Sequence, residues 1–202
     1  MQSWTWPGHE GEALSVRVFA RCGSEKVDLK LNGKSVANSP AAIGYSTEYM
    51  ATFTVPYSAG SLTASCVGNA TATKTFKTAK AAASIVLSAD RSTISADRDD
   101  LSYVTASVVD ADGTLLPDAR IPLDFAVTGD GELTAVGTGD PTDVSSFHTG
   151  KRTTWHGVAV AILRPTTTTA GSIKLTASSS GLKSASVTVA TTAKGPDSNT
   201  AA

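Results

Sequence analysis

Apolar and polar residues alternate one by one through most of this sequence, and this pattern constrains the fold more than any other feature. Val27, Leu29 and Leu31 alternate with charged residues, and Asn32-Gly33 follows them directly. Because every second side chain of a β-strand lies on the same face, each such run predicts a strand with one face in a core. Asn-Gly is typical of the two-residue turn between antiparallel strands. The sequence therefore predicts an all-β protein rich in hairpins.

Similar runs recur along the chain, and turn residues separate them at the spacing of a β-sandwich. The other positions expected to face a core are Val16, Val18, Ala20 and Cys22; Ala51, Phe53 and Val55; Leu62, Ala64 and Cys66; Ile85 and Leu87; Val104, Ala106 and Val108; Ile121, Leu123, Phe125 and Val127; Val158, Val160 and Ile162; Ile173, Leu175 and Ala177; and Ala185, Val187 and Val189.

A weak boundary near residues 78–83 divides these runs into two halves of the size of immunoglobulin domains. We therefore expect two tandem immunoglobulin-like β-sandwich domains, residues 1–80 and 81–191, and a mobile tail at 192–202. Residues 128–157 are Gly- and Asp-rich, which predicts a long loop with one short strand near 133–136. Loops of this length are often functional.

Charge and composition exclude several classes of function. The 17 basic and 18 acidic residues leave a net charge of −1, so no basic patch suggests nucleic-acid binding. No apolar run approaches the ~20 residues of a membrane helix, and the first residues lack the pattern of a signal peptide. Ser and Thr total 52, many at outward strand positions. A surface of hydroxyls is common in secreted polysaccharide-degrading proteins, so we expect a secreted, extracellular or periplasmic protein near neutral glycans.

Two cysteines and one Asn stand out as candidate modification sites. Cys22 and Cys66 lie on the inward faces of two predicted strands, which fits either a disulfide across the sheets or two buried thiols. Asn69, followed by Ala70 and Thr71, forms an N-glycosylation sequon at a plausible hairpin tip, relevant only in a secreted eukaryotic protein.

The sequence predicts neither a metal site nor a cofactor site. Its three His residues have no Cys or carboxylate at metal-ligand spacing, and residues 110–113 match only part of a calcium loop, which favours a turn. Glu132 and Asp140 could share the long loop, but Glu132 is expected in or beside a strand. We therefore assign them no paired acid/base role.

Several segments, in this order, resemble the C-terminal part of glycoside hydrolase family 2 enzymes, the β-galactosidase group. The Trp4-Thr5-Trp6 segment is similar to the stretch that leaves their catalytic barrel. Residues 27–35 and 55–64 are similar to the strands of the domain that comes next, and residues 87–104, 109–117 and 137–157 to the domain after it.

This resemblance implies a larger glycosidase of the β-galactosidase type. In that family a TIM barrel of ~250 residues carries the catalytic glutamates, and the acid/base glutamate follows an Asn. This chain has no Asn-Glu pair and no room for a barrel. The resemblance thus implies two accessory modules, with no hydrolysis by this chain itself. They would pack against the catalytic barrel, take part in a homo-oligomer, or edge the substrate cleft.

The segment expected to edge the substrate cleft is the loop from Gly139 to Arg152. Asp140, Arg152 and Trp155 offer hydrogen bonds and stacking to a sugar, although the same loop could simply be held by its own Asp and Arg contacts. Trp4 and Trp6 are expected to pack against a neighbouring domain. Two other interpretations remain open: a free carbohydrate-binding module, and an adhesin-type spacer, because the second half also resembles invasin-type immunoglobulin-like repeats.

Overall fold

The computed structural model describes residues 3–193, and their contacts divide the chain into two units that meet between Ala79 and Lys80. The expected all-β fold is confirmed: strands dominate both units, and the only helix among the described residues is the short 3-10 turn Tyr45–Thr47. No helix in this part of the chain could span a membrane. The expected mobile tail lies largely outside the described residues.

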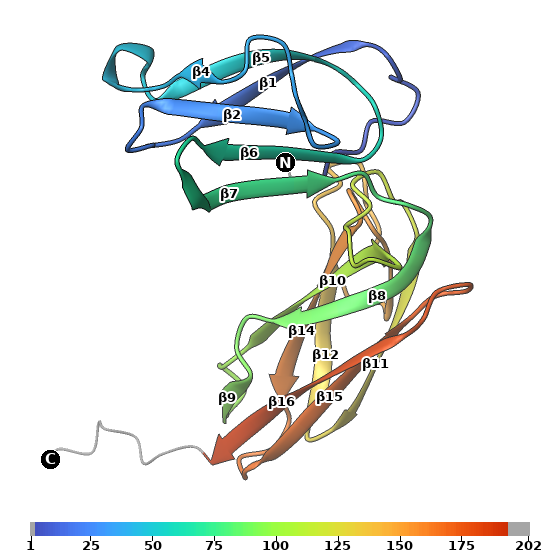
Figure 1. Ribbon diagram of the computed structural model, residues 1–202. Coiled ribbons are helices and arrows are strands. Elements are labelled where there is room, and N and C mark those ends of the chain that lie inside the picture. Colours follow the sequence, from blue (N-terminus) through green and yellow to red (C-terminus); the bar gives the residue numbers. More distant parts are fainter. Residues whose placement is uncertain (1–2, 194–202) are drawn as a thin grey trace, which may run out of the picture. The chain divides into compact units, whose positions relative to one another are not determined.

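The first unit contains two antiparallel sheets (Figure 1). Strands β1 and β5 form one sheet, and β3, β2, β6 and β7 form the other in that order, with β4 also paired to β2. The bounds are β1 Ala13–Phe19, β2 Lys26–Leu31, β3 Lys34–Ser35, β4 Ala41–Ala42, β5 Met50–Pro56, β6 Ser61–Cys66 and β7 Asn69–Lys77.

The core of this unit lies between its two sheets. Leu29 from one sheet and Phe53 from the other are both buried in it. The predicted Asn32-Gly33 hairpin is confirmed, since β2 pairs with β3 and both turn residues have positive φ. The expectation for Trp4 is wrong: its side chain, 1% exposed, packs in the core of its own unit. Its indole nitrogen donates a hydrogen bond to the Ser58 carbonyl at 3.0 Å.

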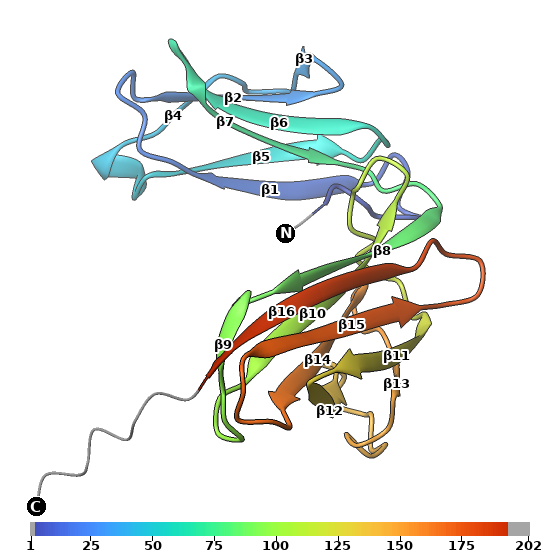
Figure 2. The same cartoon turned by 90° about the horizontal axis from the view of Figure 1, so that it is seen from below.

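The second unit also contains two sheets (Figure 2). One has the order β12-β14-β10-β8 and the other β13-β11-β15-β16-β9, and all pairs are antiparallel except β16 with β9. The bounds are β8 Ala82–Ala89, β9 Thr93–Ala96, β10 Ser102–Asp110, β11 Pro122–Gly129, β12 Gly131–Gly137, β13 Lys151–Thr153, β14 Val158–Pro165, β15 Gly171–Ser178 and β16 Ala185–Ala193.

Strand β14 faces the core with the opposite side from the one expected. Its buried residues are Ala159, Ala161 and Leu163, whereas Val158, Val160 and Ile162 are only partly buried. The register explains this, because Val104 of β10 pairs with Ala161, and residues directly opposite each other share a face of the sheet. Two alanines and Leu163 thus fill the inner face of β14, and Val158, Val160 and Ile162 line its half-covered outer face.

The long loop is shorter than expected. Residues 128–157 contain the end of β11, all of β12, and the short strand β13, which pairs with β11. The tight turn at residues 129–131 lets β12 begin at once, so only residues 138–150 connect β12 to β13. Arg152 therefore lies in a strand and not in a loop.

Candidate functional site

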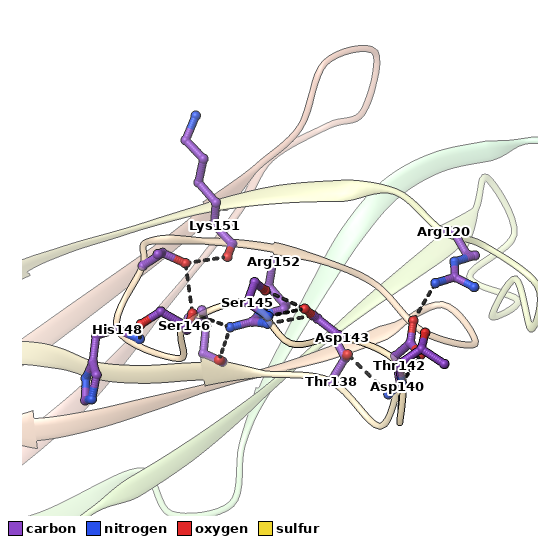
Figure 3. A network of polar contacts seen from close by, with 12 residues as sticks. Arg120, Thr138, Asp140, Thr142, Asp143, Ser145, Ser146, His148, Lys151 and Arg152 are labelled. Atoms are coloured by element: carbon purple, nitrogen blue, oxygen red, sulfur yellow. Dashed lines mark hydrogen bonds and ion pairs between the residues drawn. The ribbon is translucent and has the colours of Figure 1, made fainter.

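The segment 138–150 and strand β13 border a polar hollow of about 520 Å³ in the second unit. Figure 3 shows the network of contacts that holds this segment in place. The hollow is lined by charged side chains and by hydroxyl groups: Arg120, Asp140, Thr142, Asp143, Ser145, Thr149, Lys151, Arg152 and Thr153, together with Pro122. This set combines the expected Asp140 and Arg152 with several residues that were not expected.

Arg152 holds the loop in place through its hydrogen bonds. Its side chain is 1% exposed, and its Nη1 donates to Asp143 Oδ2 at 2.6 Å and to Ser145 Oγ at 2.7 Å. Its Nη2 donates to the carbonyls of Val136, at 3.0 Å, and Ser146, at 2.7 Å. Both terminal nitrogens are therefore committed to the protein itself. This arrangement ties the loop to β12 and makes Arg152 a structural residue of the site.

Two successive Asp-x-Ser/Thr turns shape the loop that Arg152 holds. The Asp143 carboxylate accepts hydrogen bonds from the Ser145 hydroxyl and backbone N–H, and these, followed by the Arg152 guanidinium, lower the pKa of Asp143 to about 2. Asp140 accepts from the Thr142 hydroxyl at 2.7 Å and the Thr142 N–H at 2.9 Å. These bonds, and the nearby charge of Arg120, also lower the pKa of Asp140. Both carboxylates are thus anionic at neutral pH, which does not suit a general acid.

Arg120 connects the loop with Trp155. Its guanidinium pairs with Asp140 and lies over the Trp155 ring, 4.5 Å from the centroid. The edge of the ring meets His156 at a centroid distance of 4.7 Å. One face of Trp155 is therefore covered, and Trp155 does not line the hollow. Of the three expected residues, Asp140 and Arg152 line one hollow. Trp155 does not line it, and the Arg120 guanidinium covers one face of its ring.

The groups that remain exposed around the hollow are mostly hydroxyls. Thr142, Ser145 and Thr149 are exposed, as is Lys151, whose ammonium lies 3.1 Å from the Asp124 carboxylate. Because the cations of this region are paired with carboxylates, the hollow has little net charge. The Thr142, Ser145 and Thr149 hydroxyls donate within the loop, so they offer a ligand hydrogen-bond acceptors rather than a strong field.

The other candidate residues lie elsewhere. Glu132 accepts hydrogen bonds from Arg164, at 2.7 and 2.9 Å, and from Arg98, at 3.1 Å, whereas Asp140 pairs with Arg120. Cys22 and Cys66 are joined by a disulfide with a Cα–Cα distance of 5.3 Å. Asn69 is exposed at the start of β7, and its Oδ1 accepts hydrogen bonds from the Thr71 N–H and hydroxyl. Within residues 3–193 no group of three His, Cys, Asp or Glu side chains is arranged to hold a metal ion.

Comparison with known protein families decides the identity of the second unit. Residues 85–188, about half of the chain, match the model of glycoside hydrolase family 2 C-terminal domain 5. The chain belongs to this C-terminal part of family 2. Residues 11–73 match a domain of unknown function, DUF4982. The resemblance to family 2 accessory domains that the sequence suggested is therefore confirmed.

Individual relatives extend this similarity over nearly the whole chain. A family 2 glycosyl hydrolase from Bacteroides cellulosilyticus matches 95% of the chain with a TM-score of 0.84 and 33% identity. A β-glycosidase from Bacteroides vulgatus matches 94% with a TM-score of 0.80, and at 24% identity it supports the fold alone. The β-galactosidase BoGH2A of Bacteroides ovatus is 37% identical over 118 residues. The chain spans 24% of the first structure and its match covers 14% of BoGH2A.

Sequence reasoning missed Asp143, Ser145 and Arg120. The sequence does carry a pattern that could have indicated Asp143 and Ser145. Asp140-x-Thr142 and Asp143-x-Ser145 are typical of Asx-turns, in which a carboxylate accepts hydrogen bonds from the residue two positions later. No such signal existed for Arg120. Its contact with Asp140 bridges twenty residues and depends on how β11 and the loop come together.

Proposed function

We propose that this chain is the non-catalytic C-terminal region of a family 2 enzyme of the β-galactosidase type, built from two tandem immunoglobulin-like sandwiches. The match of 95% of the chain to 24% of a family 2 glycosyl hydrolase is the observation that carries the proposal. The β-galactosidases of Bacteroides ovatus and Thermoanaerobacter pseudethanolicus, 37% and 45% identical over shorter stretches, support the type of enzyme. Two facing sheets on a shared core in the second unit support the sandwich architecture.

In this proposal the modules pack against the catalytic barrel, and they contribute to a homo-oligomer or edge the substrate cleft with the loop 138–150. The exposed hydroxyl oxygens of Thr142, Ser145 and Thr149 donate their protons within the loop and can accept hydrogen bonds from a neutral glycan. The rim role rests on Asp140 and on these hydroxyls more than on Arg152, which is buried, or Trp155, which is covered by Arg120.

The Cys22–Cys66 disulfide supports a secreted or periplasmic location, because disulfides persist mainly in oxidising compartments. In a eukaryotic secretory pathway, the exposed Asn69 would be the acceptor for a glycan.

The rim role is tested in the full-length enzyme with Asp140→Ala. We expect a raised KM for a galactoside substrate, because the loop loses the Thr142 turn and its pairing with Arg120. Asp118→Ala is a matched control, since Asp118 is exposed in the same unit and does not line the hollow. An unchanged KM with a lowered melting temperature would sink the rim role and leave the loop as a structural element. Binding of the isolated chain to a glycan array would instead favour a free carbohydrate-binding module.

A further inference from the structure

The two sheets of the first unit differ in width, which leaves part of the wider one uncovered. The sheet β1-β5 faces a sheet whose edge strand is β7 (Figure 2). The register of β6 with β7 pairs Leu62 with Phe76 and Ala64 with Lys74, so Phe76 and Lys74 lie on the same inward face as the buried Leu62. Lys74 is nevertheless exposed and Phe76 only partly buried. The inner face of β7 therefore lacks a strand opposite it.

This mismatch produces an apolar groove between β1 and β7. The groove has a volume of about 310 Å³, and its apolar walls come from Val16, Val18, Leu29, Leu62, Ala64 and Phe76. A second hollow of about 300 Å³ shares Val18 and Ala64 with these walls and extends the groove to Cys66. At its border Phe19 is 71% exposed, which is unusual for a large aromatic side chain.

The charge around the groove has one sign. Arg17, Arg21 and Lys74 border it, and no Asp or Glu lines either part. Among the described residues these three cations form no ion pair with a carboxylate. Arg21 instead lies over the Tyr49 ring, 4.8 Å from its centroid, and the Lys74 ammonium is 5.6 Å from the Phe76 ring centroid. The groove is thus apolar inside and positively charged at its mouth.

We propose that this groove binds an extended peptide segment in which apolar and acidic side chains alternate. The segment adds as a strand beside β1, which within residues 3–193 pairs with β5 alone and so presents an open edge. Because side chains of a strand alternate between faces, every second residue enters the groove opposite β7. The residues between them lie next to Arg17 on the outer face, where a carboxylate is favoured. This binding site is separate from the loop of the proposed function.

The test uses the 202-residue chain, labelled with ¹⁵N, and a capped peptide of alternating Glu and Val, about eight residues long to match a typical strand. We expect saturable NMR shifts that cluster on β1 and β7. A Lys-Val peptide, which reverses the charge, and a Glu-Ser peptide, which lacks apolar groups, should bind at least tenfold more weakly. Equal binding of the Lys-Val peptide, or no shift at millimolar Glu-Val peptide, would overturn the proposal.

A pair of variants tests the assigned charge. Arg17→Glu should weaken binding of the Glu-Val peptide about tenfold, because it places a like charge beside the acidic residues of the segment. Lys34→Glu also reverses a charge, at an exposed position on β3 away from the groove, and should leave binding unchanged. Circular dichroism verifies that both variants are folded. Equal effects of the two variants, or sedimentation showing that two copies of the chain associate through β1, would refute the acidic segment as the occupant.

Discussion

Replacing Arg152 by Met should destabilise the second unit strongly. Met keeps most of the side-chain volume but removes the guanidinium, which is 1% exposed and makes four hydrogen bonds. The Val136 carbonyl loses its donor inside the protein, and Asp143 loses its cation. Because the Asp143 side chain is 23% exposed, water can replace much of its lost ion pair. The buried Val136 carbonyl is left unsatisfied, at a cost of about 1–3 kcal/mol.

The assay is hydrogen exchange followed by mass spectrometry. A loss of about 1–3 kcal/mol corresponds to roughly one to two decades in the opening equilibrium of amides that exchange by global unfolding. Peptides from β10 report on the second unit and should exchange faster by this factor. Peptides from β5 report on the first unit and should not change.

Lys151→Met is the matched control at the adjacent residue. The Lys151 side chain is 80% exposed and its ion pair with Asp124 lies at the surface, where such pairs contribute about 0–1 kcal/mol. If Arg152→Met and Lys151→Met shift the exchange of β10 peptides equally, the account of Arg152 as the anchor of the loop is refuted.

Three further predictions concern stability. The pKa of Asp143 is lowered to about 2 in the folded protein, so its contribution to the free energy of unfolding is present above pH ~4 and is lost as the pH falls toward 2. The difference in urea midpoint between the wild type and Asp143→Asn should shrink over that range. A constant difference would contradict the assignment. Joint replacement of Cys22 and Cys66 by Ser removes a disulfide between residues 44 apart in the sequence and should destabilise the first unit by about 4 kcal/mol, from the chain entropy of the opened loop. Hydrogen exchange of β5 peptides should then become faster, and that of β10 peptides should not change. Leu163→Ala should cost the second unit about 2–5 kcal/mol in urea unfolding, because Leu163 is fully buried; a larger loss in Ile162→Ala, at the half-covered neighbour, would contradict the register of β14.

Strand positions were predictable wherever alternation was clear. β2, with Val27 and Leu29 buried, follows the sequence pattern, and so does β15, with Ile173 and Leu175 buried. The failure at β14 has a physical cause. In Val158–Pro165 every residue but Arg164 is apolar, so size suggested the wrong face, and only pairing with β10 decides between Ala161 and its larger neighbours.

The candidate site was predictable only in part. Asp140 and Arg152 could be assigned to one segment, and they do border one hollow. Sequence could not show that Arg152 points inward, because its burial depends on acceptors from β12 and from the loop, residues 136 and 146. Nor could it show that Arg120 covers Trp155, a contact between residues distant in the chain.

The proposal of an accessory region implies that this chain has no catalytic activity of its own. It is tested most directly by incubating the purified 202-residue chain, expressed in a host without β-galactosidase, with p-nitrophenyl β-galactoside. No release of nitrophenol above the buffer rate is expected, because the sequence has no Asn-Glu pair and residues 3–193 form no TIM barrel. Steady hydrolysis that rises in proportion to the concentration of the chain would contradict it.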